Sequence, residues 1–379
     1  MTIVLLSLAA LLGLTLTAHL LSAAMTAWRE SRPPKPVPDE LPFIALMRPV
    51  CGVDPFDAET LGSSFNLDYP NYEVIFCAPS ERDPACALVR RLIEENPQVR
   101  ARLLTGLDAV SGNPKLNNLH KGLSATEAEW LAMADSNLLL PRDYLQRLVA
   151  EWRPGTGLVS APPVAERPGN LWGAVEAAFL NTNQARWQVA ADMIGMGFAQ
   201  GKSLFWRRDI LMAGGGFAAL GRNMAEDVAS TKLVRRQGLK VRLTRHLFAQ
   251  PIGMRSARAV WDRQLRWSKV RRDGFVMIFA AEIAQGPFLP FLAALALAAL
   301  GAMPWIALPL LVALWYGAEV LLARIAGWPA SARDIAGFAI RDAMLPALWL
   351  MTWFGRDFTW RGNDMTHRDV ARSDAPVTE

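Results

Sequence analysis

Two kinds of hydrophobic pattern divide the chain. Long apolar runs with few charges lie near both ends, whereas residues 41–245 alternate short apolar runs with segments of helical period. Short runs rich in β-branched and aromatic residues predict strands, and longer periodic ones predict helices. This alternation indicates an α/β domain with a largely parallel sheet. The predicted strands are residues 43–50, 72–78, 99–105, 130–134 and 157–160, and the predicted helices are residues 84–95 and 143–152.

The first apolar run predicts a transmembrane anchor. Residues 2–28 contain no Lys, Arg, Asp or Glu, and about 20 apolar residues suffice to cross a bilayer. A signal peptide is the alternative, although no basic residue precedes the run. Arg29, Arg32 and Lys35 follow at once, so we expect the next part of the chain to be cytoplasmic. Proline-rich residues 29–40 form a linker.

The last third predicts further membrane helices. Residues 287–303 carry no charge and residues 304–323 carry only Glu319, which predicts a helical hairpin that crosses and returns. Residues 335–354 are also apolar but contain adjacent Arg341 and Asp342. These two could pair with each other in the bundle or make the segment re-entrant. The basic residues 356–379 are expected to form a cytoplasmic tail.

Composition agrees with a membrane protein that has a folded catalytic part. Hydrophobic residues make up 52% and charged residues 20%, which disfavours both a disordered chain and an ordinary soluble enzyme. The net charge of +5 suits an anionic lipid surface or a phosphorylated substrate, and is too small to indicate nucleic acid. The 3 cysteines have no CxxC spacing, so they indicate neither a disulfide framework nor structural zinc.

Acidic residues that follow predicted strands are the first candidates for a site. They are Asp83, Asp135 and the adjacent Glu226 and Asp227. A carboxylate at the end of a parallel strand can hold a divalent cation or a nucleotide-sugar, although it can equally cap the next helix. At residues 135–137, Asp-Ser-Asn clusters polar groups where a metal-bound diphosphate would lie. Asp227 is a candidate general base, with an acidic helix start as the alternative.

Two basic segments are candidates for binding phosphate. Lys115 offers a cation, and Asn117 and Asn118 offer amides for hydroxyls or a base edge, unless this segment is only a solvated turn. On a helix, residues 263, 266 and 267 share one face through i, i+3 and i, i+4 spacing. That face presents two guanidinium groups and an indole, which suit a diphosphate and a sugar or base, or else anionic lipid headgroups.

Together these motifs resemble the ceramide glucosyltransferases, a family of membrane-bound inverting glycosyltransferases with a GT-A-type nucleotide-sugar fold. The motifs occur in the family's order and, with the anchor and the C-terminal membrane segments, cover nearly the whole chain. They lie at residues 52–55, 67–74, 83–85, 113–119, 134–136, 226–227 and 263–267. The resemblance implies an α/β GT-A-type domain with an N-terminal transmembrane anchor and C-terminal transmembrane helices.

The resemblance also implies a role for each acid. Asp83 would contact the uridine, Asp135 would lie at the metal and the diphosphate, and Asp227 would be the catalytic base. The cofactor would be a divalent cation, Mg²⁺ or Mn²⁺, held by Asp135. The expected donor-binding residues are Asp83, Lys115, Asn117, Asn118, Asp135, Arg263, Arg266 and Trp267, the last three forming the (Q/R)xxRW motif.

The implied activity is transfer of one sugar, with glucose expected, from a UDP-sugar to the primary hydroxyl of a membrane lipid. The resemblance implies ceramide or diacylglycerol as the acceptor. Residues 161–163 lack the histidine of the animal enzymes, and residues 179–187 look closer to bacterial relatives, some of which resemble enzymes that glycosylate diacylglycerol, so the resemblance leaves the acceptor lipid open. The alternatives are a hopanoid glycosyltransferase, a processive polysaccharide synthase and a non-catalytic nucleotide-sugar-binding protein. A multi-pass protein of the bacterial inner membrane with a cytoplasmic catalytic domain is expected.

The expected domain organisation follows the motifs along the chain. It comprises an anchor at residues 1–28, a linker at 29–40, a GT-A-type domain at 41–272 that ends in the RxxRW helix, interfacial and transmembrane helices at 273–355, and the tail at 356–379.

Overall fold

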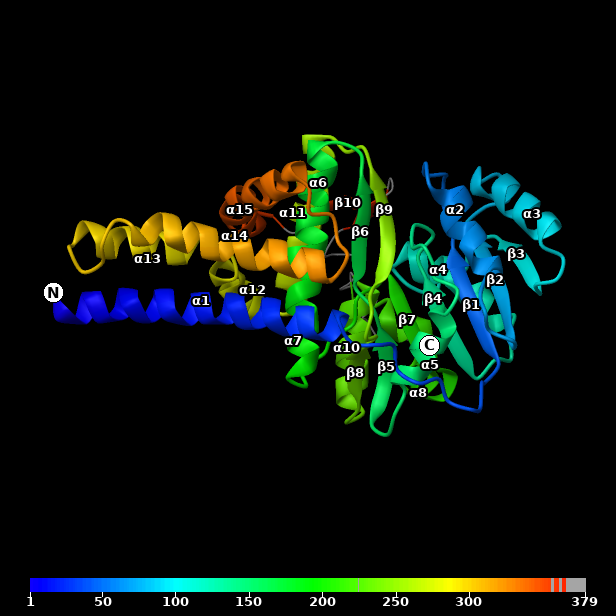
Figure 1. Cartoon of the computed structure of the whole chain (residues 1–379). Helices are drawn as coiled ribbons and strands as arrows, with labels where there is room; N and C mark the ends of the chain where they lie inside the picture. Colours follow the sequence, from blue (N-terminus) through cyan, green and yellow to red (C-terminus); the bar gives the residue numbers. More distant parts are fainter. Residues whose placement is uncertain (224, 356–357, 361–362, 366–379) are drawn as a thin grey trace. The chain divides into compact units, whose positions relative to one another are not determined.

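The computed structural model describes residues 1–223, 225–355, 358–360 and 363–365 (Figure 1). The chain forms two compact units, and each is assembled from separate stretches of sequence. The sheet unit consists mainly of Pro33–Val164 and Ala191–Pro251. The helical unit consists of Met1–Arg32, Ala165–Ala190 and Ile252–Arg356. The predicted basic tail at residues 356–379 lies outside the described residues, except for the short antiparallel strands β10 (Phe358–Trp360) and β11 (Asn363–Met365).

A seven-stranded sheet forms the centre of the sheet unit, in the order β3-β2-β1-β4-β7-β5-β8. β1 pairs in parallel with β2 and β4, β2 with β3, and β5 with β8, whereas β7 runs antiparallel to β4 and β5. The largely parallel sheet expected from the sequence is therefore confirmed, and β7 and β8 are strands that the pattern did not predict. The strands are β1 (Ile44–Pro49), β2 (Tyr72–Ala78), β3 (Ala101–Thr105), β4 (Trp130–Ala134), β5 (Thr156–Ser160), β7 (Ser203–Arg207) and β8 (Lys240–Leu243).

Helices cover both faces of this sheet, because its central strands are apolar on both sides. In β1, Ile44 and Leu46 belong to one buried cluster and Ala45 and Met47 to the other, as the period of two in a strand requires. The first cluster includes side chains of α2 (Asp57–Gly62), α3 (Ala85–Glu95) and α5 (Tyr144–Glu151). The second includes side chains of α4 (Pro114–Ser124), α8 (Arg208–Ala213), α9 (Gly216–Leu220) and α10 (Glu226–Arg236). A short 3-10 helix, η1 (Ser63–Phe65), follows α2.

The parallel strands β1, β2 and β4 all end at one edge of the sheet. In a parallel sheet that edge carries the loops that bind ligands, because the carboxyl ends of the strands open there. Asp83 and Asp135, which follow β2 and β4, come from these loops, so the topology places the sequence candidates on one side of the sheet.

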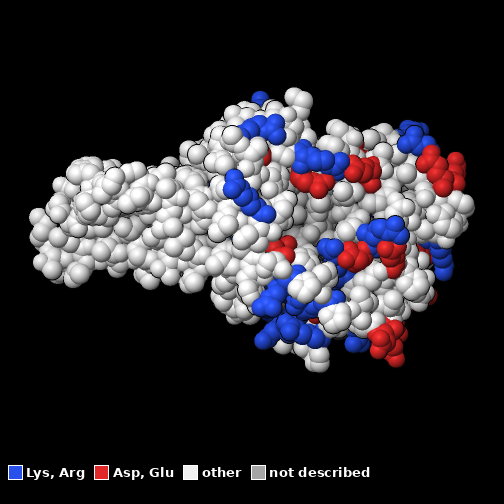
Figure 2. All heavy atoms as spheres, viewed as in Figure 1, with Lys and Arg blue, Asp and Glu red and all other residues white. Residues whose placement is uncertain are grey.

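The helical unit contains helices that are long and apolar enough to cross a membrane. They are α1 (Thr2–Glu30), α14 (Ala307–Ile325) and α15 (Ala332–Thr352). Figure 1 shows α1 running alongside α13 and α14, and on the face drawn in Figure 2 the surface of these helices is free of charged side chains over most of its length. The other elements of this unit are α6 (Leu171–Ala178), η2 (Phe179–Ala185), α11 (Ala257–Gly274), α12 (Val276–Ala281), η3 (Glu282–Ala284) and α13 (Phe288–Ala299). The boundaries between the units along the chain fall within α7 (Arg186–Met193) and within β6 (Pro163–Pro168) and β9 (Phe248–Gly253), which pair with each other.

The first arm of the predicted hairpin is shorter than expected. α13 has 12 residues, which at about 1.5 Å per residue span less than the roughly 30 Å hydrocarbon core. It joins Val276–Ala284 in a pair bent by 42°, which is either a broken span or a re-entrant loop. The break contains Gly286 and Pro287, and proline cannot continue the preceding helix. The second arm corresponds to α14, and the predicted segment 335–354 corresponds to α15 (Ala332–Thr352), which is long enough for a span.

Charged residues inside the helical unit pair with one another. Both carboxylate oxygens of Glu319 accept from Arg341 at 3.0 Å, and Arg341 also donates to Asp342 at 2.8 Å. The pairing of Arg341 with Asp342 that the sequence left open is thus observed, and Glu319 of α14 is an additional partner. On the other side of Glu319, Arg186 lies 3.6 Å away and donates to His19 of α1 at 2.9 Å. The cluster therefore ties α1, α7, α14 and α15 together.

Arg341→Met tests this cluster, because it leaves two buried carboxylates without their main partner. We expect the free energy of unfolding in detergent to fall by about 3–5 kcal/mol, the usual cost of breaking a buried ion pair. Arg324→Met, at an exposed position of α14, is the control and should leave the unfolding transition in place. Equal effects of the two substitutions would show that the cluster does not stabilise the bundle.

Candidate functional site

Lys115 lies at the centre of the polar site in the sheet unit. It enters the site from the first turn of α4, which starts where the Asn113 side chain accepts from the backbone N–H groups of Lys115 and Leu116 and where Pro114 occupies the first turn. Its Nζ lies 2.6 Å from Asp135 Oδ1 and 2.7 Å from Glu226 Oε1, and it donates to the Gly201 carbonyl at 2.6 Å. The side chain is buried, and burial alone would lower its pKa, but the two carboxylates raise the pKa above its usual value.

Asp135 is held by two ammonium groups. Lys115 contacts Oδ1, and Lys202 Nζ lies 2.9 Å from Oδ2. The same Lys202 Nζ donates to Asn137 Oδ1 at 3.0 Å, so one cation bridges the first and third residues of the Asp-Ser-Asn segment. Burial alone would raise the pKa of Asp135, but Lys115 and Lys202 hold it well below its usual range. Asp135 is therefore ionised at neutral pH, and the charges of Lys115 and Lys202 are balanced by those of Asp135 and Glu226.

Asp227 occupies a different environment although it adjoins Glu226. Its Oδ2 accepts from the Gly201 N–H at 3.1 Å and its Oδ1 from the Val228 N–H at 2.8 Å. Burial, and then the negative charge of Glu226, raise the pKa of Asp227 to about 6. A carboxylate with a pKa near neutrality is a better proton acceptor than an ordinary aspartate, so Asp227 has the property expected of a general base.

Gly201 allows these groups to approach one another. A Cβ atom at this position would lie 2.7 Å from Glu226 Oε1 and 3.6 Å from Asp227 Oδ2. The backbone of Gly201 instead contacts Lys115 through its carbonyl and Asp227 through its N–H. Any side chain here would therefore displace Glu226 from Lys115.

A buried arginine holds the loop that carries Asp135. The guanidinium of Arg48 donates to the backbone carbonyls of Asp135, Ser136 and Leu138 at 3.0–3.1 Å. Burial lowers the pKa of Arg48 to about 10, so the group stays charged at neutral pH. Arg48 was not among the predicted site residues, although it is the lone charge within the apolar strand β1, and that isolation is the sequence signal that could have indicated it.

The other predicted residues of the sheet unit hold loops in place. Asp83 accepts from the backbone N–H groups of Gly52 and Ala85, at 2.9–3.2 Å. Asn117 bonds to Ser111 through both its amide oxygen and its amide nitrogen, and Asn118 donates to the Cys77 carbonyl at 2.6 Å. Each of these side chains thus bonds to backbone groups of the sheet unit, and the roles of Asp83, Asn117 and Asn118 in donor binding stay predictions.

The predicted RxxRW segment belongs to the helical unit, on α11. Arg263 forms an ion pair with Glu176 of α6, and Arg255 lies 3.3 Å from the other oxygen of the same carboxylate. Trp267 packs on a small cluster that includes Ala177 and Leu180. Arg263 thus already has a buried acidic partner, which the helical spacing did not predict because Glu176 is distant in sequence.

Lys202 is a functional candidate that the sequence pattern did not indicate. It lies immediately before β7, in a segment that the hydrophobic pattern did not assign to a strand. Because β7 inserts antiparallel beside β4, its first residues lie next to the last residues of β4, and this brings Lys202 to Asp135. In the sequence, the feature that could have indicated Lys202 is a single lysine that follows Gly201 at the start of an apolar run.

Sequence similarity to a known family agrees with this geometry. The sequence profile of glycosyl transferase family 21 matches residues 5–372. The chain belongs to glycosyl transferase family 21. The family resemblance drawn from the motifs is thereby confirmed.

Two relatives, both ceramide glucosyltransferases, align with parts of this chain. Ceramide glucosyltransferase 1 of Caenorhabditis elegans is 26% identical over 256 residues, which is 67% of this chain and 54% of the relative. A ceramide glucosyltransferase of Komagataella phaffii is 39% identical over 118 residues, which is 30% of this chain and 23% of the relative. The match thus spans about half the length of the first relative and less of the second.

A solved structure confirms the fold. A mannosyltransferase from Pyrobaculum calidifontis, in complex with GDP-Man and Mn²⁺, aligns with a TM-score of 0.52 at 21% identity and covers 92% of this chain and 99% of its own. The GT-A-type α/β fold expected for this family 21 member is therefore confirmed.

Proposed function

We propose that this chain is an inverting glycosyltransferase that moves one sugar, glucose, from a UDP-sugar to the primary hydroxyl of ceramide or diacylglycerol. The observation that carries the proposal is the arrangement in the sheet unit, where a carboxylate with a raised pKa adjoins a buried cluster of two ammonium groups. A base and a cation-rich phosphate site are the two parts that such a transfer requires. Family membership and the names of the two relatives support the same reaction.

In the proposed reaction Asp227 removes the proton from the lipid hydroxyl. The hydroxyl oxygen then forms a bond to the anomeric carbon while the bond from that carbon to the diphosphate oxygen breaks. The leaving UDP takes the bonding electron pair, and Asp227 keeps the proton. Because attack and departure occur on opposite sides, an α-linked donor yields a β-glycolipid.

The cations of the site have a defined role in this proposal. Lys115 and Lys202 would stabilise the negative charge that develops on the departing diphosphate. Their present carboxylate partners keep both side chains in place before the donor binds. We propose Arg266 and Trp267 as further donor contacts, whereas the Arg263 guanidinium would have to share its partner Glu176 with the donor.

A divalent cation, Mg²⁺ or Mn²⁺, fits the donor set at Asp135. Among the described residues no group of three or more His, Cys, Asp or Glu could hold a metal by itself. Magnesium, however, is commonly bound through one or two protein oxygens together with substrate phosphates. The side-chain oxygens of Asp135 and Asn137 converge on one positive charge, that of Lys202, so a divalent cation held by these oxygens would replace the Lys202 ammonium group, which would then turn to the diphosphate. When bound there, the cation would neutralise charge on the diphosphate.

We propose that the reaction takes place at the membrane surface. We propose a multi-pass protein of the bacterial inner membrane whose domain at residues 41–272 acts on the cytoplasmic side, with anchor 1–28, linker 29–40 and membrane helices at 273–355. The basic residues after α1 support this orientation.

The test is UDP release by the detergent-purified chain with UDP-glucose, UDP-galactose or UDP-glucuronate against ceramide and diacylglycerol. Mass spectrometry of the product should show one sugar per lipid. A ladder of sugars would instead indicate a polysaccharide synthase. A product formed only with hopanoids would show that the acceptor is a hopanoid and not ceramide or diacylglycerol. Donor binding without any product would contradict catalysis.

Asp227→Asn keeps the size of the side chain and removes the base. We expect kcat to fall by about 10²–10⁴-fold with UDP binding retained, since that is the usual contribution of a general base. Asp209→Asn is a matched control, because Asp209 also lies in the first turn of a helix and accepts from the next backbone N–H at 2.8 Å. Near-normal turnover of the Asp227 variant would exclude Asp227 as the base.

The pH dependence follows from the raised pKa of Asp227. Below about pH 6 this carboxyl becomes protonated and cannot accept the hydroxyl proton, so kcat/KM should fall about tenfold per pH unit and level off above pH 7. UDP binding measured over the same pH range separates loss of the base from loss of the donor. A kcat/KM that stays flat from pH 5 to 8 would contradict the assignment.

Removal of divalent cations tests the metal. We expect chelation with EDTA to lower kcat/KM by more than about tenfold, with recovery on addition of Mn²⁺ or Mg²⁺, because a metal typically supplies several kcal/mol at a phosphoryl oxygen. Full activity in EDTA would contradict a metal at Asp135. Lys202 would then remain as the cation that bridges Asp135 and Asn137.

A further inference from the structure

Two large apolar side chains are exposed on the loop that follows α7, in the sheet unit. Ile194 is 65% exposed and Met196 is 56% exposed. The backbone of this loop is nevertheless fixed. The Gly195 N–H donates to the Asp192 carbonyl at 2.9 Å, and the φ of 82° at Gly195 permits the turn. The Met196 N–H donates to the Ala191 carbonyl at 2.8 Å, so the loop holds both side chains in contact with solvent.

The loop lies along the outer edge of β8, the last strand of the seven-stranded sheet. The Asp192 side chain accepts from the Leu243 N–H at 3.2 Å. A Cβ atom at Gly197 would lie 2.5 Å from the Val241 carbonyl oxygen, so the backbones of the loop and of β8 are in close contact. The loop thereby covers an edge strand, which would otherwise present unpaired backbone groups. Covering the edge requires the backbone of the loop and does not require exposed Ile and Met side chains.

Arginine side chains flank this loop. Arg235 of α10 donates to the Gly197 carbonyl at 3.1 Å. Val241 of β8 belongs to the buried cluster that α10 also joins, so the period of two places Arg242 on the opposite face of the sheet. Figure 2 shows Lys and Arg side chains gathered where Figure 1 draws α10 and β8. The exposed apolar residues therefore lie between cations from both faces of the sheet.

The positive charge at this edge is not balanced by ion pairs. Burial, and then the charge of Arg153, lower the pKa of Arg242, so these two guanidinium groups are close enough to repel each other. Glu151, a carboxylate nearby, pairs with Lys35. The term β8 surface is used below for the side chains of Ile194 and Met196 together with those of Arg153, Arg235, Arg242 and Arg245. None of these four arginines forms an ion pair with a described residue.

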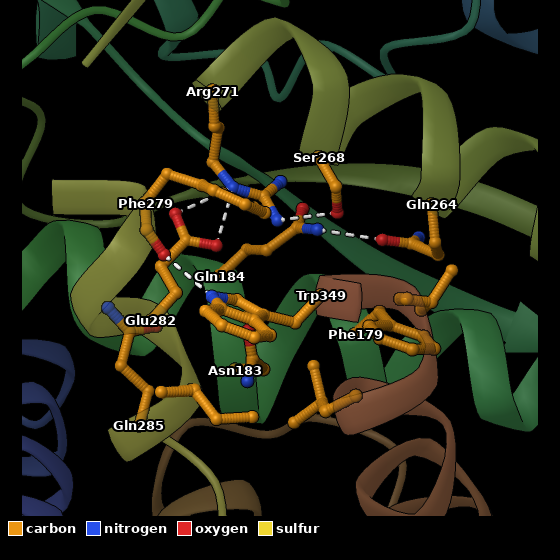
Figure 3. Close-up of a pocket in the computed structure, with 13 residues that line it drawn as sticks. Phe179, Asn183, Gln184, Gln264, Ser268, Arg271, Phe279, Glu282, Gln285 and Trp349 are labelled. Carbon is orange, nitrogen blue, oxygen red and sulfur yellow. Dashed lines mark hydrogen bonds and ion pairs between the residues drawn. The ribbon is translucent and has the colours of Figure 1, made fainter. Parts of the chain in front are cut away.

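Arginines in the helical unit differ in this respect. Around a cavity of about 30 Å³, Arg271 donates to both oxygens of Glu282, at 2.9 and 3.0 Å, and to Ser268 Oγ at 3.0 Å (Figure 3). This cavity is too small to hold a lipid head, and its cation is already neutralised. The arginines of the β8 surface, by contrast, can contact an external anion without losing a carboxylate partner.

The chain brings the β8 surface close to a candidate membrane span. Arg245 donates to the Pro33 carbonyl at 2.8 Å. Pro33 is three residues after Glu30, the last residue of α1. Three residues extend over at most about 11 Å, so the contact ties Arg245 to the end of α1. Any membrane that α1 crosses therefore lies near these cations.

We propose that the β8 surface docks the sheet unit on a bilayer that contains anionic phospholipids. Ile194 and Met196 enter the headgroup region, and the four arginines contact lipid phosphates. Buried apolar area and electrostatic attraction to anionic lipids together determine how strongly a surface binds to a membrane, and this surface supplies both. A soluble polyanion would engage the arginines and leave the apolar side chains in water. Because the lipids bound here are not substrates, the inference goes beyond the proposed reaction.

A fluorescent probe on the loop tests the docking in the full chain. Met196→Cys carries nitrobenzoxadiazole in a Cys51→Ser background, because Cys51 is the exposed native cysteine. The chain is placed in nanodiscs that hold one copy each, with a doxyl-labelled lipid as the quencher. We expect quenching about twofold stronger in discs of phosphatidylcholine and phosphatidylglycerol than in phosphatidylcholine alone, because anionic lipid attracts the arginines. Arg235→Gln combined with Arg242→Gln should remove this difference.

Leu107→Cys is the matched control for the probe. Leu107 is 54% exposed and follows β3, the strand at the opposite edge of the sheet, so its probe should not be quenched. Equal quenching at residues 107 and 196 would overturn the proposal. Equal quenching of the residue 196 probe in both kinds of disc, or quenching that survives the two arginine substitutions, would overturn it as well.

Hydrogen exchange provides a second measurement that needs no label. Peptides that span residues 192–197 should exchange severalfold more slowly in the anionic discs, and Ile194→Ser should reverse this. If inorganic phosphate alone slowed exchange in neutral discs, the ligand would be a free phosphate, and slowing only in discs with two chains would indicate a second copy; either result contradicts lipid docking. Neither measurement uses sugar transfer, so docking and the proposed reaction can fail independently.

Discussion

Charge that is removed from water must be paired, and in the sheet unit this requirement centres on Asp135. Its two oxygens are paired with lysines from different parts of the chain, Lys115 at the start of α4 and Lys202 before β7. The Asp135 side chain is half-buried, and its ion pairs with these two lysines hold α4 and β7 beside the end of β4. Arg48 of the central strand β1 donates to the backbone carbonyls of the loop after β4 and so fixes this loop to the sheet. The result is a fixed cluster of two lysines and two carboxylates at the position where the donor diphosphate is expected.

Buried charges are also paired in the helical unit, where the pairs join helices to one another. Arg341 is fully paired with the carboxylates of Glu319 and Asp342, and Glu176 is paired with two arginines of the α11 region. These pairs bind helices to one another and leave little charge for a ligand.

Glu226 and Asp227 are adjacent acids whose different surroundings give them different properties. Glu226 and Asp227 both begin α10, and both carry the same charge in the sequence. The longer side chain forms an ion pair with Lys115, whereas the shorter one accepts from backbone N–H groups and lies beside the charge of its neighbour. Asp227 therefore has the raised pKa of a base, while Glu226 completes the ion cluster.

The sequence by itself determined the α/β class, the strands of the parallel half of the sheet, the apolar helices and the family, because these depend on hydrophobic period and on motifs that are local in sequence. It did not determine that Lys202 meets Asp135, that Glu176 holds Arg263, or that residues 179–185 form a π-helix. Each of these depends on which distant segments become neighbours, as when β7 inserts antiparallel beside β4. Long-range pairing of buried charge and of backbone groups is a property of the folded chain, so only the tertiary structure decided which of the candidate residues contact one another.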